Sequence, residues 1–198
     1  MRKVAMLTWL FILLAIIITV FWQYEWVYSL PTPVPHNYRA IEPGTPINVS
    51  HTLPFKKDKP VLLHFYNPDC PCSKFNIPHF KSLVGQFHDK ITFAIVPVTR
   101  KKLTAHDILK KFDLDIPVIF DTALMTACGV YSTPQAVLLD TNRQLYFRGN
   151  YNRTRYCTDT KTEYARMAIN KLLQNNAAII FDQFALKAYG CQLPKCAK

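Results

Sequence analysis

The segment from Val61 to Ser73 (VLLHFYNPDCPCS) constrains the fold more than any other part of the chain. An apolar run typical of a buried strand leads directly into a proline-containing turn, and residues 73–88 then show helical spacing of apolar residues. Cys70 and Cys72 therefore stand where a strand ends and a helix begins. The free N–H groups and positive dipole end of a helix stabilise a thiolate over a thiol. Because the thiolate is the reactive form, this position predicts redox chemistry or soft-metal binding.

The N-terminus carries a candidate membrane span. The 19 residues Val4–Trp22 contain no charged side chain, and a helix needs about 20 residues to cross a bilayer. Arg2 and Lys3 precede this stretch, and the next Lys or Arg is Arg39. The positive-inside rule then predicts a cytoplasmic N-terminus and a C-terminal domain on the other side. We expect a single-pass protein of the inner (cytoplasmic) membrane, with that domain in the periplasm.

A cleaved signal peptide is the alternative interpretation of the same stretch. Its apolar run exceeds the usual length of about 7–15 residues, and no small-x-small cleavage site follows it. The aromatic residues at and after its end are typical of an interfacial belt that holds a spanning helix in place. They are Trp22, Tyr24, Trp26 and Tyr28. These features favour an uncleaved anchor.

Composition limits the partners of the chain. The net charge is +11, but the basic residues form small scattered groups that suit a solvated surface, and no nucleic-acid partner is expected beyond a membrane.

Of the 198 residues, 49% are hydrophobic, which fits one domain with a true core. We divide the chain into a membrane anchor (1–28), a Pro-rich linker expected to be an extended spacer (29–59), a domain (60–176) and a Cys-containing tail (177–198).

The domain alternates strand-like and helix-like patterns. After the first helix comes a second apolar strand at residues 91–98, followed by a helix at 104–112 that Thr104 caps together with Asp107. Then follow a short apolar run at 118–121, a brief helix at 122–128 ended by Gly129, a hairpin of strands 135–140 and 144–149, and a helix at 160–173. This order predicts an α/β fold with a mixed parallel and antiparallel sheet covered on both faces.

The order of elements, with a cysteine turn after the first domain strand, resembles the thioredoxin-like superfamily over residues 60–175. The segment 130–140 (VYSTPQAVLLD) is similar to the loop that carries a cis-proline before a core strand, and residues 144–149 (QLYFRG) resemble its hairpin partner. The resemblance is nearest to the redoxin or peroxiredoxin-like branch. It implies a three-layer sandwich, Cys70 as nucleophile, and Thr133 and Pro134 as a site that binds the backbone of a substrate peptide.

The chain departs from the Cys-x-x-Cys motif of that superfamily. Ser73 stands where the second cysteine would be, and Cys72 lies one residue early. We expect Cys72 to resolve the mixed disulfide on Cys70, with a tail cysteine as the alternative resolver. Ser73 is a candidate donor to the Cys70 thiolate. The peroxiredoxin pattern has Thr three residues before the nucleophile, and Asn67 stands there instead, which argues against peroxidase activity.

The remaining cysteines have no place in that motif. Cys128 is expected to be a small apolar residue of the core. Cys157, Cys191 and Cys196 are candidates for a structural disulfide that fastens the tail, with Cys157–Cys191 preferred and Cys191–Cys196 as the rival. Six cysteines allow 15 pairings, so the sequence does not fix the connectivity. Cys70 itself is expected to be exposed at its tight turn.

Three functions fit these features. The first is a membrane-anchored thiol–disulfide oxidoreductase outside the cytoplasm, with protein thiols or disulfides as partners and no cofactor or metal. The second is a copper chaperone of the same fold, because two close thiolates and a histidine such as His64 suit Cu(I). The third is a non-catalytic binding protein.

Overall fold

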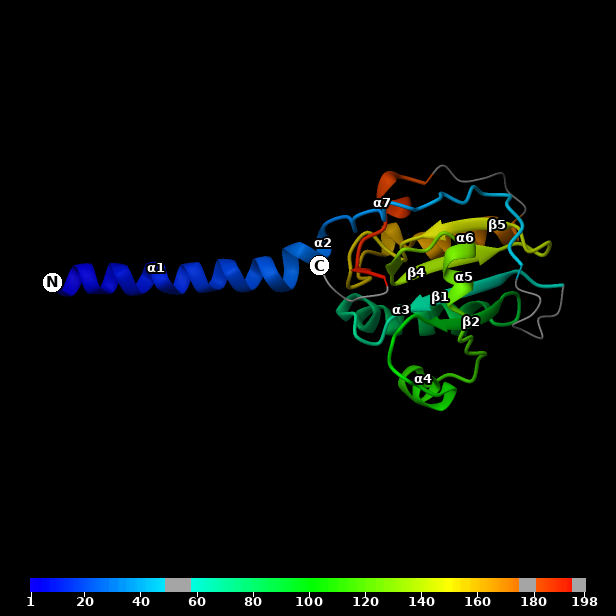
Figure 1. Ribbon diagram of the computed structural model, residues 1–198, viewed down its shortest axis with the longest axis horizontal. Coiled ribbons are helices and arrows are strands. Elements are labelled where there is room, and N and C mark those ends of the chain that lie inside the picture. Colours follow the sequence, from blue (N-terminus) through cyan, green and yellow to red (C-terminus); the bar gives the residue numbers. More distant parts are fainter. Residues whose placement is uncertain (49–57, 175–180, 194–198) are drawn as a thin grey trace.

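The computed structural model describes residues 1–48, 58–174 and 181–193. A long helical segment projects away from the folded domain (Figure 1). It consists of α1 (Arg2–Phe21), the π-helical η1 (Trp22–Trp26) and α2 (Val27–Ser29). The 28 residues Arg2–Ser29 form a helix long and apolar enough to cross a membrane, and the side chains of its apolar stretch are not buried against the domain. The predicted apolar helix is therefore present.

The domain is built on a four-stranded sheet in the order β2-β1-β4-β5. The strands are β1 (Val61–Tyr66), β2 (Thr92–Pro97), β4 (Gln135–Leu139) and β5 (Leu145–Gly149). β1 pairs in parallel with β2 and antiparallel with β4, and β4 pairs antiparallel with β5. The mixed sheet and the hairpin expected from the sequence are confirmed.

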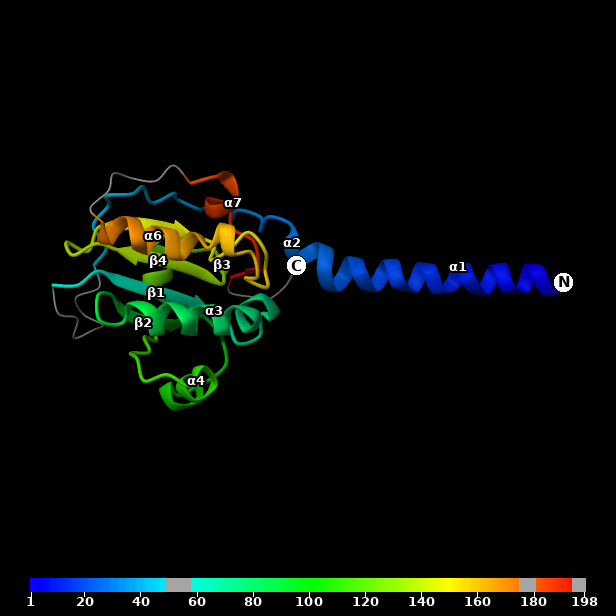
Figure 2. The same cartoon turned by 180° about the vertical axis from the view of Figure 1, so that it is seen from behind.

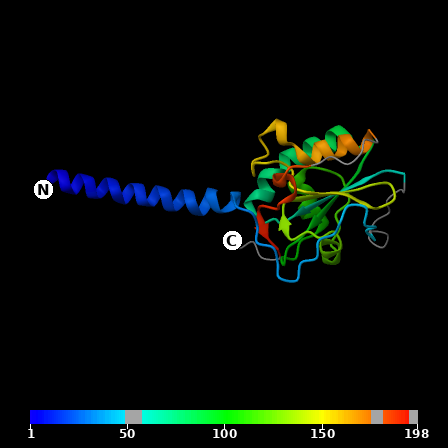
Figure 3. The same ribbon diagram turned by 90° about the horizontal axis from the view of Figure 1, so that it is seen from above.

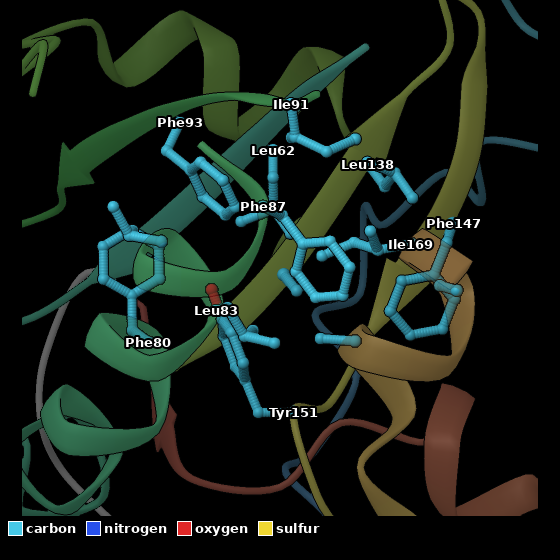
Figure 4. Close-up of a cluster of buried hydrophobic side chains, with 14 of the residues drawn as sticks. Leu62, Phe80, Leu83, Phe87, Ile91, Phe93, Leu138, Phe147, Tyr151 and Ile169 are labelled. Carbon is cyan, nitrogen blue, oxygen red and sulfur yellow. The ribbon is translucent and has the colours of Figure 1, made fainter. Parts of the chain in front are cut away.

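Helices cover one face of the sheet more heavily than the other. On one face lie α3 (Pro71–Phe87) and α6 (Tyr164–Leu173), which Figures 2 and 3 show side by side. Leu62 and Tyr66 of β1 face this layer, in a cluster that Figure 4 shows in part. Residues 61, 63 and 65 belong to the core on the opposite face, with α5 (Thr122–Ala127). β1 is buried on both faces, which explains why its sequence is almost continuously apolar.

The other elements are short. The helix α4 (Ala105–Phe112) begins with the predicted capping box between Thr104 and Asp107. The predicted helix at 160–173 is divided at Glu163 into a 3-10 turn, η2 (Thr160–Thr162), and α6. The remaining elements are β3 (Ser132–Thr133), α7 (Gln183–Leu186) and β6 (Cys191–Gln192). β3 and β6 form a separate two-stranded antiparallel sheet.

The Pro-rich segment is extended but packs on the domain along its described part, residues 30–48. Thr32 and Ile47 are buried, with 3% and 4% of their surfaces exposed. Backbone bridges join Pro31 to Tyr189 and Pro46 to Gln144. The expected extended, non-helical backbone is confirmed for residues 30–48. The segment also contacts the domain, because Ile47 is buried in the core and Ile41 packs against it.

His64 belongs to the core rather than to the cysteine turn. Its ring stacks on Phe80 at a centroid distance of 4.3 Å, and its Nδ1 hydrogen bonds to the Tyr151 hydroxyl at 2.7 Å. Burial lowers the pKa of His64 from 6.5 to about 3, with the charge of His79 as a smaller cause. Burial and then the charge of Arg166 lower the pKa of His79 to about 4. Both rings are therefore neutral at neutral pH.

These two histidines predict a loss of stability in acid. Below pH 6.5 both histidines become protonated in the unfolded chain but stay neutral in the folded chain. The free energy of unfolding therefore falls as the pH decreases toward 4, by at most about 1.4 kcal/mol per pH unit for each histidine. His64→Gln keeps a partner for Tyr151 and removes one titrating group, so it should roughly halve this slope in urea titrations. His88→Gln, at an exposed side chain, is the matched control. An unchanged slope in His64→Gln would contradict the assignment.

Candidate active site

The turn between β1 and α3 fixes Cys70 at the N-cap of α3. The Cys70 amide donates to the Asn67 carbonyl at 3.1 Å, and Pro71 occupies the first helical position, where its missing N–H is no loss. The Asn67 side chain accepts from the Asp69 amide at 2.9 Å, while the Ser73 hydroxyl accepts from the Asn67 amide at 3.3 Å. Asn67 and Ser73 thus shape the turn. A hydrogen bond from Ser73 to a Cys70 thiolate stays a prediction for the reduced state.

Cys70 forms a disulfide with Cys191, 121 residues later in the chain, with a Cα–Cα distance of 5.9 Å. Cys191 lies in β6, directly opposite Thr133 of β3. The Thr133–Pro134 peptide bond is cis, as the resemblance implies. The Sγ of Cys70 lies 3.4 Å from the Thr133 carbonyl oxygen. The structure therefore brings Cys70, Thr133 and Pro134 together and adds Cys191 to them.

Both expected tail pairings are wrong, because the Cys191 sulfur is bonded to Cys70. Cys157 is a thiol that accepts a hydrogen bond from the Asn76 side chain at 3.1 Å, and Cys196 lies outside the described residues. The alternative of a tail cysteine that reaches Cys70 is the arrangement observed. Pairing of β6 with β3 directs the tail across the N-terminus of α3, and this long-range pairing has no signal in the local sequence.

The expected exposure of Cys70 is also wrong. Cys70 and Cys72 have 0% of their surfaces exposed, and Cys191 has 1%. The three side chains form one buried cluster against which Tyr28 packs. The sequence predicts that Tyr28 belongs to an aromatic belt; in the structure it lies in α2, and its side chain packs against the cysteine cluster. Cys72 is a buried thiol, and its role as resolver stays a prediction with no disulfide to support it here.

Arg155 fastens the end of the N-terminal helix over the cysteine cluster. Its Nη2 lies 2.8 Å from the Glu25 carboxylate, and the Tyr156 hydroxyl hydrogen bonds to the same carboxylate. The Arg155 guanidinium also lies over the rings of Tyr28, at 5.3 Å, and of Phe75, at 5.3 Å. Apart from Tyr28 in the predicted aromatic belt, no motif or spacing in the sequence indicates these residues. The one available signal was Glu25, the only acidic residue between the N-terminus and Arg39.

The other cysteines with described positions are poor nucleophiles. Cys128 is buried in the core, as expected, and burial raises the pKa of its thiol to about 12. Burial likewise raises the pKa of Cys157 to about 11. Burial thus keeps both thiols protonated at neutral pH.

The described residues form no metal site built from three or more His, Cys, Asp or Glu ligands. Within ranges 1–48, 58–174 and 181–193, no group of three or more His, Cys, Asp or Glu side chains gathers that could hold a metal ion. His64 bonds to Tyr151 instead of facing the cysteines. The copper hypothesis therefore gains no support from these residues.

Solved structures similar to this chain define its class. A hypothetical protein from Sinorhizobium meliloti 1021 matches 78% of this chain and 95% of its own, with a TM-score of 0.64 and 18% identity. A thioredoxin-like protein solved in its oxidised form matches 68% of this chain and 97% of its own, with a TM-score of 0.50 and 17% identity. The fold is thioredoxin-like, as the resemblance implied.

The chain belongs to the family of the domain of unknown function DUF6436, whose model matches residues 45–193. Among curated proteins, thiol-disulfide oxidoreductase ResA of Halalkalibacterium halodurans is 23% identical over 90 residues, which are 44% of this chain and 51% of that protein. The chain thus spans about half the length of this relative. The curated protein that this part of the chain matches is a thiol–disulfide oxidoreductase.

Peptide mapping under non-reducing conditions should find a fragment that joins Cys70 to Cys191. In the native state Cys128 should resist alkylation, because its side chain is fully buried, and it should react after denaturation. The measurement is mass spectrometry of proteolytic fragments from chain alkylated before and after unfolding. A fragment joining Cys157 to Cys191 would contradict the observed pairing.

Proposed function

We propose that this chain is a membrane-anchored thiol–disulfide oxidoreductase that acts on protein disulfides through Cys70, outside the cytoplasm. The observation that carries the proposal is the Cys70–Cys191 disulfide at the N-terminus of α3, in contact with the residue before a cis-proline. A helix N-terminus stabilises the thiolate that reduction of this disulfide would release. The partial match to a curated thiol-disulfide oxidoreductase supports the same chemistry.

The position of Cys191 supports its assignment as the resolving cysteine. The Cys70 thiolate attacks a substrate disulfide, forms a mixed disulfide and releases the first substrate sulfur as a thiolate. The Cys191 thiolate then attacks the Cys70 sulfur, which forms the observed disulfide and releases the second substrate thiolate. The substrate disulfide is reduced and the enzyme oxidised by two electrons. A protein dithiol restores the enzyme by the reverse exchange.

Membrane anchoring is supported by the contacts at the end of the N-terminal helix. The Glu25–Arg155 ion pair and the packing of Tyr28 on the cysteine cluster attach this helix to the domain beside its reactive disulfide. In Figure 1 the red segment that contains β6 lies at this same end of the domain. The site would then face the membrane surface, which favours substrates or redox partners that are themselves held at the membrane.

Substitution of single cysteines should assign the roles. Cys70→Ser should reduce disulfide exchange to background, because the attacking sulfur is lost. Cys191→Ser should accumulate mixed disulfides, because attack remains possible while resolution fails. Non-reducing gel electrophoresis followed by mass spectrometry detects these adducts, and Cys157→Ser is the matched control. If Cys72→Ser rather than Cys191→Ser accumulates adducts, Cys72 is the resolver.

The proposed topology has a direct test. A reporter that is active only outside the cytoplasm, fused after Lys198, should be active, because Arg2 and Lys3 hold the N-terminus inside. The mass of the mature chain should include the residues of α1. A cytoplasmic reporter signal would contradict the orientation, and a mass that lacks α1 would show that the helix is a cleaved signal.

A further inference from the structure

The tail strand β6 lies along β3 in the manner of a bound peptide. Cys191 is opposite Thr133, Gln192 is opposite Ser132, and the Leu193 amide donates to the Tyr131 carbonyl at 3.1 Å. Recognition by strand addition uses main-chain hydrogen bonds for affinity and side-chain positions for selectivity. Under the proposed function, the Thr133 backbone is the partner of the substrate segment. β6 therefore occupies the edge of β3 that a substrate would need, and this edge beside Thr133 is called the groove below.

The residue before the bonded cysteine in β6 has no room for a side chain. Gly190 has φ of +116°, a conformation that L side chains rarely adopt, and a Cβ at this position would collide with the carbonyl oxygen of Thr133. The close approach is to backbone at the edge of β3, which has no flexible end that could move aside. An occupant that follows the path of β6 must have glycine immediately before its cysteine.

Two side-chain hydrogen bonds hold the backbone of the tail just before Cys191. The Ser132 hydroxyl donates to the Tyr189 carbonyl at 3.1 Å, and the Thr32 hydroxyl donates to the Gly190 carbonyl at 3.3 Å. After the cysteine, the Leu193 side chain enters the core on the second face of the sheet and has 8% of its surface exposed. The groove thus fixes the main chain before the cysteine and offers an apolar position two residues after it.

From these contacts we propose that the groove beside Thr133 binds extended protein segments in which glycine precedes the reacting cysteine. β6 competes with these segments for the groove. The inference rests on the proposed function and adds a substrate class to it. With β6 in place the disulfide is buried, so a protein substrate reaches Cys70 only when β6 has left. The tail and the substrate alternate in one groove.

The competition couples resolution to product release. In the mixed disulfide the substrate cysteine is bonded to Cys70, and its segment lies along Thr133. The Cys191 thiolate attacks the Cys70 sulfur, the bond between Cys70 and the substrate breaks, and the substrate sulfur leaves with the electron pair as a thiolate. β6 pairs with Thr133 as the substrate segment departs. Bond formation by Cys191 thus breaks the bond to the substrate, and pairing of β6 with Thr133 then keeps the product from returning.

The test uses the full-length Cys191→Ser variant in detergent, which cannot form the disulfide with Cys70. The probe is the terminally blocked peptide Tyr-Gly-Cys-Gln-Leu, the sequence of residues 189–193, with its cysteine activated as a disulfide to thionitrobenzoate. The matched control peptide is Tyr-Val-Cys-Gln-Leu. We expect the glycine peptide to form the Cys70 adduct about tenfold faster or more, the scale of one misfitted side chain. Mass spectrometry identifies the adduct.

A second variant measures the competition by the tail. Gly190→Val combined with Cys191→Ser should keep β6 out of the groove and should accelerate adduct formation with the glycine peptide relative to Cys191→Ser alone. In the unmodified chain, reduction by a dithiol should accelerate hydrogen exchange of the Leu193 amide. Equal rates for the two variants, together with unchanged exchange on reduction, would show that β6 is no competitor.

The outcomes separate this inference from the proposed function. If both peptides form the Cys70 adduct at the same rate, the preference for glycine is overturned while thiol–disulfide exchange at Cys70 stands. If neither peptide reacts in the folded chain but both react with Cys70 after denaturation, the proposed function fails and the inference fails with it.

Discussion

The disulfide between Cys70 and Cys191 is the covalent link on which the arrangement of the site depends. It joins the first turn of α3 to a tail strand 121 residues later. Closure of so long a loop lowers the conformational entropy of the unfolded chain. In the chain-entropy model this raises the free energy of unfolding by about 4–5 kcal/mol. The pairing of β6 with β3 and the bridge from Pro31 to Tyr189 both lie beside this link. The disulfide therefore lies where the tail, β3 and the Pro-rich segment meet.

The site combines a reactive position with complete burial. A helix N-terminus favours a thiolate, yet the tail strand and Tyr28 cover the sulfur atoms from solvent. Under the proposed function, chemistry with a protein substrate then requires movement. The two-residue strand β6 lies outside the four-stranded sheet, so its departure would leave that sheet intact. The Arg155–Glu25 pair belongs to the same cover, so the end of the N-terminal helix and the Cys70–Cys191 disulfide are physically connected.

Much of the fold could be predicted because its signals are local. β1 is apolar along its length since both of its faces are buried, and Thr104 with Asp107 forms the capping box that their spacing indicates. The cysteine turn and the cis-proline loop were recognisable from short motifs. Failures concern contacts between distant segments: the packing of the Pro-rich segment, the burial of Cys70 and the partner of Cys191. Each of these contacts joins residues far apart in the sequence, so local spacing does not indicate it.

The sequence by itself determined the apolar N-terminal helix, the α/β order and the position of Cys70 at the start of a helix, because hydrophobic spacing and helix-capping chemistry act over a few residues. Only the tertiary structure decided which cysteine meets Cys70. The pairing depends on where β6 adds to β3 and on the glycine that lets its backbone approach Thr133. Several cysteines compete in sequence, and the geometry of the folded chain selects one because a disulfide forms only between sulfur atoms held in contact.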